Sequence, residues 1–267
     1  MRPAHRFDTQ PGSLHSSPML PPVLILTIAL ISSSHGPLPP PVQVLTQFEA
    51  ASDQVRRSAV ETYSKGCRDR RARMRYRKQP GALSRFERAA TDPATQVRRA
   101  AVAMATCFGP QKSAPALSKL VADSDAATSL KAMNQVADFS DASTTAAMIT
   151  WLTKHRARCM APGDDEREHC IFALYATGQS ARHEPRESKL KLGAAKALLP
   201  FLSSDVPKAR EVSAVALSFV GGRSDAEPIM ELVKKEEQGS FSLVNSAEVI
   251  AQLHGIARQL SQTSESR

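Results

Sequence analysis

The chain has 267 residues, of which 42% are hydrophobic and 5% aromatic, and it carries a formal net charge of +9 at pH 7. This length suffices for one large or two small domains, and the apolar share is that of a globular protein. Because no long stretch of Val, Ile and Thr alternates with polar residues, the composition argues against a sheet and favours helices packed through small residues.

The N-terminal segment is typical of an export signal. A mainly apolar run over residues 23–31 follows a leader that contains Arg2 and Arg6, and small serines follow the run. Nine residues are too few to cross a bilayer, which needs about 20. We therefore predict that residues 1–34 are a signal peptide cleaved near Ser34. An uncleaved membrane anchor or a disordered leader on a cytoplasmic protein are the alternatives.

The next segment, residues 35–41, contains four prolines and predicts a short, stiff polyproline spacer. The folded domain is expected to follow it over residues 42–256. At the other end, residues 257–267 finish with SQTSESR, which predicts a disordered tail.

One feature recurs within the expected domain. An Ala followed by a larger residue lies in helix-like segments that are 31 to 42 residues apart. A Gly follows seven or eight residues later in four of them, where it would close the helix. These glycines are Gly66, Gly109, Gly222 and Gly255. The repeat alanines are Ala59, Ala101, Ala132, Ala173, Ala214 and Ala247.

An Asp and then a basic residue precede several of the repeat alanines. Asp92 and Arg98 do so in TDPATQVRRAAV, and Asp205 and Arg210 do so in SDVPKAREVSAV. Such an Asp can cap the helix that follows it, and the basic residue can reach the Asp of a neighbouring repeat. With an apolar stretch before each Asp, the pattern predicts units of two antiparallel helices joined by a tight turn. It indicates a fold and not a function.

These residues resemble the HEAT-repeat family, particularly its short form, the phycobilisome-lyase HEAT-like repeats. The resemblance implies an all-α fold, a right-handed α-solenoid of about six antiparallel helix pairs, whose extended surface suits polypeptide binding. The unit over residues 151–178 keeps the spacing but lacks the Asp and Arg pattern, and we expect an irregular loop at 156–170. The clearest copies of the repeat lie at residues 87–109, 113–125 and 199–222.

The segment CRDRRARMRYRKQP, residues 67–80, holds seven basic residues and one acid. It contributes +6 of the +8 that remains without the predicted signal peptide, so the basicity is local. We expect an insertion between two helices. It is a solvated connector, a site for an anionic or acidic partner, or a nucleic-acid contact with Tyr76 as a stacking face. The candidate residues are Arg68, Arg70, Arg71, Arg73, Arg75, Tyr76, Arg77 and Lys78.

The four cysteines form two candidate disulfides. Cys159 and Cys170 flank a loop-like segment, and their bond is favoured in an oxidising compartment, where it would contribute about 3 kcal/mol or less. Cys67 and Cys107, 40 residues apart, are the second candidate pair. A zinc site that includes the neighbouring His155 and His169 is the alternative. We expect no metal, because His169 and Cys170 are adjacent and no CxxC occurs.

The chain contains no Gly-rich phosphate loop, no G-x-S-x-G turn and no HExxH. We therefore expect a non-catalytic interaction or scaffolding module without cofactor or small-molecule substrate, exported to the periplasm or cell envelope. Its expected partner is a protein, and the basic insertion could anchor an acidic or anionic surface. The alternatives are a nucleic-acid-binding protein, if the chain is cytosolic, and a bilin lyase or lyase subunit, since some members of the family attach bilins to phycobiliproteins.

Overall fold

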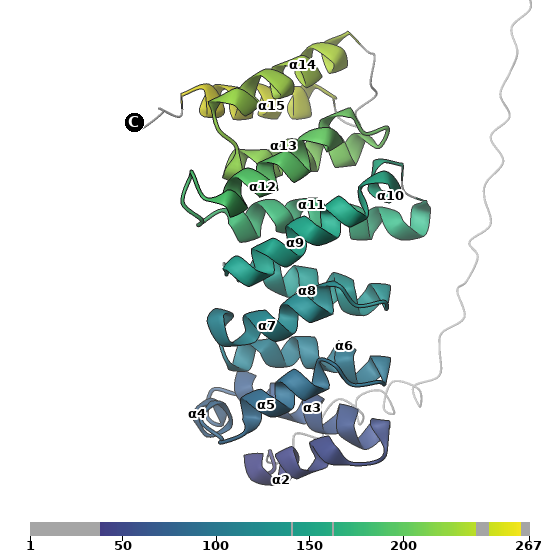
Figure 1. Cartoon of the computed structure of the whole chain (residues 1–267), viewed down its shortest axis with the longest axis vertical. Coiled ribbons are helices and arrows are strands. Elements are labelled where there is room, and N and C mark those ends of the chain that lie inside the picture. Colours follow the sequence, from purple (N-terminus) through teal and green to yellow (C-terminus); the bar gives the residue numbers. More distant parts are fainter. Residues whose placement is uncertain (1–37, 140, 162, 239–245, 263–267) are drawn as a thin grey trace, which may run out of the picture. The chain divides into compact units, whose positions relative to one another are not determined.

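The computed structural model describes residues 38–139, 141–161, 163–238 and 246–262 (Figure 1). The chain divides into two units, Met1–Leu38 and Pro39–Arg267, and the second contains all of the helices discussed below. The predicted signal peptide and most of the predicted spacer lie outside the described residues.

Every regular element in the described ranges is a helix, as predicted for an all-α fold. None of these helices combines the length and the apolar character needed to span a membrane. One row of helices contains members that each contact the next: α3 (Asp53–Arg68), α6 (Thr95–Met104), α8 (Ala126–Ala137), α11 (Asp164–Ala181), α13 (Pro207–Val220) and α15 (Ser246–Ser261).

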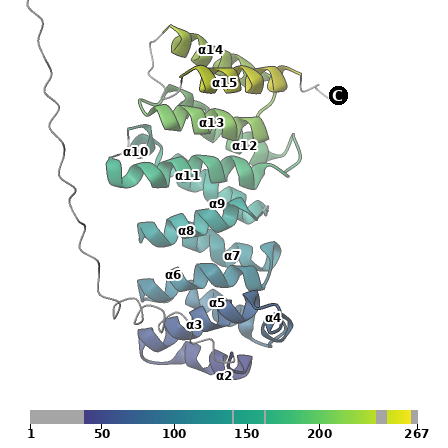
Figure 2. The same ribbon diagram turned by 180° about the vertical axis from the view of Figure 1, so that it is seen from behind.

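A second row covers the first, and the helices of Pro39–Arg267 succeed one another in chain order (Figures 1 and 2). The members of this row are α2 (Pro41–Thr46), α5 (Ala82–Ala89), α7 (Pro110–Val121), α9 (Ala142–Lys154), α12 (Lys189–Leu198) and α14 (Ala226–Glu237). Within the row, α5, α7, α9 and α12 contact in turn, and α14 packs on the 3-10 helix η3 (Leu199–Ser203), which continues α12.

Shorter elements join the rows. They are the helices α4 (Arg73–Arg77) and α10 (Arg156–Met160) and the 3-10 helices η1 (Gln47–Glu49), η2 (Ala105–Cys107) and η4 (Arg223–Asp225).

The repeat alanines mark the buried face of the first row. Small side chains at these positions let neighbouring helices pack closely. At Gly178 in α11 the approach is closer still, because an added Cβ would lie 2.7 Å from the Cβ of Ala216 in α13. Ala247 lies in a helix as predicted but differs from the other repeat alanines because it is exposed, and the buried face of α15 begins at Val249. The alanines that are at most 1% exposed are Ala59, Ala101, Ala132, Ala173 and Ala214.

Arginines near the start of the first-row helices link successive pairs, as the sequence pattern predicted. Arg56 donates to both carboxylate oxygens of Asp92, at 2.7 and 2.9 Å, and Arg98 donates likewise to Asp123, at 2.6 and 2.9 Å. Burial alone would raise the pKa of Asp92, but hydrogen bonds from Arg56 and from the Ala94 amide outweigh it and lower that pKa below its usual value. These aspartates therefore stay ionised and hold neighbouring units together.

The corresponding arginine in the C-terminal part has a different partner. Arg210 donates to Glu236 of α14 at 2.9 Å, and both side chains are almost fully buried. Asp205, the Asp of the local pattern, is exposed. Glu236 lies 26 residues after Arg210, nearly the 25 residues that separate Arg98 from Asp123, but it is a Glu inside α14 and not an Asp of the recurring pattern, so the sequence analysis did not indicate this pair.

Two of the glycines predicted to close helices lie inside them instead. Gly66 is part of α3, and Gly255 is part of α15. Gly66 is required by packing, because an added Cβ would meet the aromatic ring of Tyr76. Gly109, with φ +79° and ψ 173°, has a positive φ that favours glycine, and it lies directly before α7.

Three expected irregular segments are more ordered than predicted. The proposed loop at 156–170 consists largely of α10 and the beginning of α11, where Glu166 lies in the first turn and negative charge favours the helix. The spacer ends early, because Pro41 starts α2, a position that suits proline. At the C-terminus, α15 continues to Ser261 and buries Ala257 and Leu260, so the helix covers the first residues of the predicted tail.

Candidate partner-binding site

The basic segment 67–80 folds into a turn and a short helix. Asp69 ends α3, and its Oδ1 accepts hydrogen bonds from the amides of Arg71 and Ala72 at 2.8 and 2.7 Å. Asp69 therefore uses its carboxylate to shape the backbone, and α4 follows directly. The expected insertion exists, but it is a packed element on the side of α3 rather than a free connector (Figures 1 and 2).

Tyr76 fastens α4 to the domain. Its side chain is fully buried, its ring lies 4.9 Å from that of Tyr63 in an edge arrangement, and its hydroxyl donates to the carbonyl of Pro39 at 2.6 Å. The hydroxyl of Tyr63 in turn donates to the carbonyl of Tyr76. Burial raises the pKa of both phenols. The prediction that Tyr76 offers a stacking face is therefore wrong, because the ring fills the space left by Gly66.

Two further links join the segment to η2 of the following unit. A disulfide connects Cys67 with Cys107, whose Cα atoms are 5.3 Å apart. Arg77 donates to the carbonyl of Thr106 at 2.9 Å, and burial, followed by the charge of Arg73, lowers the pKa of Arg77. Arg77 thus belongs to the packed side of the segment, unlike the other candidate arginines.

The remaining basic side chains face solvent. Arg68 folds back and donates to the carbonyl and hydroxyl oxygens of Ser64, at 3.4 and 3.3 Å. The others, which we call the basic platform, form no ion pair with any described residue. Met74, 57% exposed, lies among them as an apolar contact surface. The basic platform consists of Arg70, Arg71, Arg73, Arg75 and Lys78.

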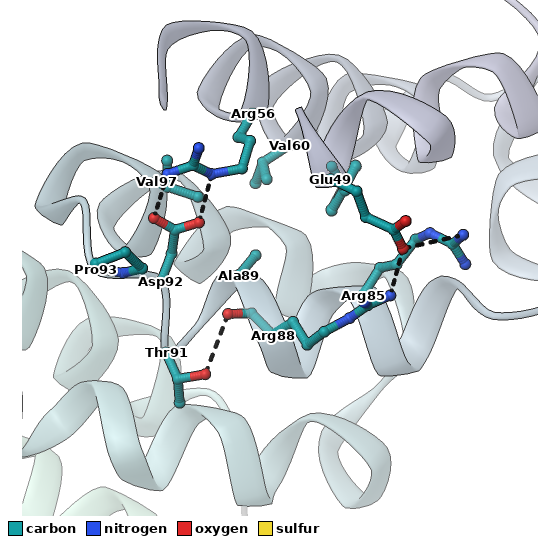
Figure 3. A pocket seen from close by; sticks show the side chains of 11 residues that line it. Glu49, Arg56, Val60, Arg85, Arg88, Ala89, Thr91, Asp92, Pro93 and Val97 are labelled. Carbon is teal, nitrogen blue, oxygen red and sulfur yellow. Dashed lines mark hydrogen bonds and ion pairs between the residues drawn. The ribbon is translucent and has the colours of Figure 1, made fainter. Parts of the chain in front are cut away.

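A cavity of about 270 Å³ beside η1, α3 and α5 also contains several charged groups (Figure 3). Arg56 and Asp92 point toward each other there, and Glu49 accepts from Arg88 at 2.9 Å and pairs with Arg85 at 3.5 Å. Each charge therefore has a protein partner. With a volume slightly below the usual 300 to 1,000 Å³ of ligand sites, this cavity serves the contact between helix pairs.

The second group of candidate residues surrounds a second disulfide. Cys159 and Cys170 are bonded, with Cα atoms 5.3 Å apart, so both sulfurs of the alternative zinc site are used. Nδ1 of His155 donates to the carbonyl of Trp151 at 2.8 Å. Among the described side chains no group of three or more His, Cys, Asp or Glu residues is arranged to hold a metal ion.

No protein-family model and no curated protein matches the chain. Among solved structures, an engineered protein from the Northeast Structural Genomics Consortium aligns with a TM-score of 0.56 and 14% identity, over 82% of this chain and 96% of its own. The complex of CpcE and CpcF of phycocyanin lyase from Nostoc sp. aligns with a TM-score of 0.42 and 19% identity, over 84% and 97%. The first likeness shows a shared fold alone, and the second is too weak to support an argument.

Proposed function

We propose that the mature chain is an exported, non-catalytic interaction module of the HEAT-like type. It is a right-handed α-solenoid of about six antiparallel helix pairs that binds a protein partner, and the basic platform anchors an acidic patch of that partner. One observation carries the proposal: five exposed cations without a described ion-pair partner are held on an element that a disulfide and two buried tyrosines fix in place.

Fixation of the platform favours binding because less conformational freedom is lost when a partner docks. The side chains are long and exposed, but their backbone is already ordered by Asp69 and Tyr76. Arg gives bidentate hydrogen bonds to carboxylates, and both Arg and Met are enriched at the centre of protein interfaces. The exposed Met74 between Arg73 and Arg75 therefore fits a protein surface well.

The same geometry weighs against nucleic acid. Single-stranded nucleic acid is bound by positive charge combined with aromatic side chains on which bases stack. Tyr76, the aromatic residue of segment 67–80, is buried, so the platform supplies charge without stacking.

Two observations support export. Both pairs of cysteines are bonded, and such disulfides persist in oxidising compartments and are rare in the cytosol. The sequence of residues 1–34 independently resembles a secretory signal peptide.

The test compares two variants that lose the same charge. The platform variant is Arg70→Gln/Arg71→Gln/Arg73→Gln/Arg75→Gln. The matched control is Lys112→Gln/Lys119→Gln/Lys131→Gln/Arg258→Gln, which removes four exposed cations from other helices. A labelled poly-glutamate peptide, a single-stranded DNA of equal charge and anionic vesicles serve as probes at low and high salt.

We expect the peptide to bind the native chain and the control in a salt-sensitive manner, and to bind the platform variant at least about tenfold more weakly. Equal peptide binding by the platform variant and the control would reject the platform as an anchor. Tighter binding of DNA or vesicles than of the peptide would reject an acidic protein as the partner. Pull-downs from envelope fractions with the same three chains then identify the partner.

A further inference from the structure

A larger cavity lies apart from the basic platform, between the turn that joins α7 to α8 and the region where α9, α10 and α11 meet. Its volume is about 590 Å³, within the usual range of small-molecule sites. The side chains that matter below are those of Asp123, Trp151, Lys154, His155, Arg158 and His169.

Three aromatic rings form a fixed wall of this cavity. The ring of Trp151 stacks on those of His155 and His169, with centroids 4.2 and 4.8 Å apart. Nδ1 of His155 donates to the carbonyl of Trp151. Nε2 of His169 lies 3.2 Å from the hydroxyl of Ser129, which gives its own proton to the carbonyl of Val121, so the ring nitrogen is the donor. The wall is therefore ordered before any ligand arrives.

The disulfide places two of the lining residues. Arg158 directly precedes Cys159, and His169 directly precedes Cys170. The bond therefore fixes α10 against the beginning of α11 and holds both side chains at the cavity. This explains how a chain segment that lacks the regular repeat pattern still forms a defined site.

The charged residues that line the cavity are one acid, Asp123, and two bases, Lys154 and Arg158, so positive charge is in excess. Asp123 is engaged by Arg98, and Arg158 is paired with Glu166. Lys154 forms no ion pair with any described residue. Burial, and to a smaller extent the neighbouring charge of Arg158, lower the pKa of His169, so this ring favours its neutral form. The cavity thus combines an apolar aromatic wall with a cation that lacks a counter-charge.

We propose that this cavity binds a small organic anion, a carboxylate or phosphate on an apolar body. Its charged group lies at Lys154 and Arg158, and its apolar body lies against the wall formed by Trp151 and His155. The site is separate from the platform, and its failure would leave the proposed partner binding untouched.

Trp151 is the single tryptophan of the chain, so a ¹⁵N-labelled sample gives one indole resonance that reports on the cavity directly. The titrants are 2-naphthoate, 2-naphthyl phosphate and the uncharged 2-naphthamide. We expect at least one of the two anions to shift the indole resonance saturably, and the amide to bind about tenfold more weakly because it lacks the charge. Absence of a saturable shift with both anions, or equal affinity for the amide, overturns the proposal.

Two variants should change the affinity in opposite directions. Lys154→Gln removes the cation and should weaken anion binding about fivefold or more, whereas Glu166→Gln releases Arg158 and should tighten binding severalfold. Lys189→Gln, an exposed lysine outside the cavity, is the control and should have no effect. If the site were purely apolar, all three variants would bind the anions with the affinity of the native chain, and that result would also overturn the proposal. Unchanged backbone resonances elsewhere establish that each variant is folded.

Discussion

The first and the last contacts between helix pairs are held by different means. At the first, Arg56 and Asp92 keep side chains that are 15% and 10% exposed, and the disulfide between Cys67 and Cys107 adds a covalent link. At the last, Arg210 and Glu236 have side chains that are 1% and 0% exposed, and all four cysteines lie elsewhere.

The arginine near the start of a first-row helix therefore contributes to stability differently at the two contacts, as Arg56 and Arg210 show. An ion pair in contact with water contributes little, because water competes for both charges. A buried pair responds far more strongly when one partner is removed, because the remaining charge stays in a medium that solvates it poorly. At the N-terminal contact the disulfide therefore reinforces an ion pair that keeps some contact with water, whereas the C-terminal contact depends on an ion pair that is fully buried.

Breaking the buried pair should have the largest effect. We expect Glu236→Ala to lower the free energy of unfolding by about 3 to 5 kcal/mol, since the buried guanidinium of Arg210 loses the Glu236 carboxylate. Asp92→Ala should lower it by about 1 kcal/mol. Urea denaturation measures both, and Arg210→Met/Glu236→Leu, which removes both charges, should recover most of the loss. Equal effects of the two alanine variants would show that burial does not separate the contacts.

Removal of the covalent links comes next. By the chain-entropy model, we expect Cys67→Ser/Cys107→Ser to lower the free energy of unfolding by about 4 kcal/mol. Cys159→Ser/Cys170→Ser opens a shorter loop and should lower it by about 3 kcal/mol. Denaturation of both variants, beside the native chain with and without reductant, checks this order. An unchanged unfolding midpoint after full reduction would mean that the N-terminal contact does not need its disulfide.

Acid should weaken the contacts made by Asp92, Asp123 and Asp125, and we expect this loss of stability to be smaller than the two effects above. Hydrogen bonds from Thr128 and Arg99 outweigh burial and lower the pKa of Asp125 to about 2, and the pKa values of Asp92 and Asp123 are also lowered. Because these carboxyls bind protons more readily when unfolded, their stabilisation is complete above about pH 4 and is lost as the pH falls toward about 2. Urea midpoints across this interval measure the loss, and Asp125→Asn should reduce the slope. Faster hydrogen exchange of the amides in α6 and α8 at low pH would show where stability is lost. Urea midpoints that do not change with pH in the native chain would contradict the prediction.

The smallest effect should come from the basic platform. Its four-residue Gln variant should change the free energy of unfolding by no more than about 0.5 kcal/mol, because the side chains are exposed. Arg77→Gln should lower it by about 1 kcal/mol, since the hydrogen bond to the Thr106 carbonyl is lost. Thermal melts distinguish the two, and a larger loss in the platform variant would reveal packing that the exposed positions do not indicate.

The repeated features of the fold were predictable from the sequence because they depend on local spacing. The buried alanines recur in five units, and the pairs Arg56–Asp92 and Arg98–Asp123 occupy the same place at the first two contacts between helix pairs. Glu236 was not predicted, because it is a Glu near the end of α14 and the recurring pattern pointed to an Asp at the turn.

The basic platform and the cavity at Trp151 also differ in how far the sequence predicts them. The charge of segment 67–80 is visible in the sequence, but the burial of Tyr76 depends on Gly66, which was interpreted as a helix end. Nothing in the sequence predicted the cavity at Trp151, since its lining comes from separate helices and from residues next to two cysteines. Two signals were available: the spacing of Trp151, Lys154, His155 and Arg158, three or four residues apart, and the two histidines beside the cysteines, which were considered only as metal ligands.

The placement of Cys67 also bears on resistance to proteolysis. Trypsin-like enzymes prefer exposed loop tips that can unfold locally, and a run of arginines would ordinarily be such a target. Here the arginines lie on a turn and helix that Tyr76 holds against the domain, so local opening must first break that packing. If a cut does occur after Arg70, Arg71, Arg73 or Arg75, the N-terminal piece still carries Cys67 and stays bonded to Cys107 in the other piece. A nicked molecule would therefore keep both fragments together until it is reduced.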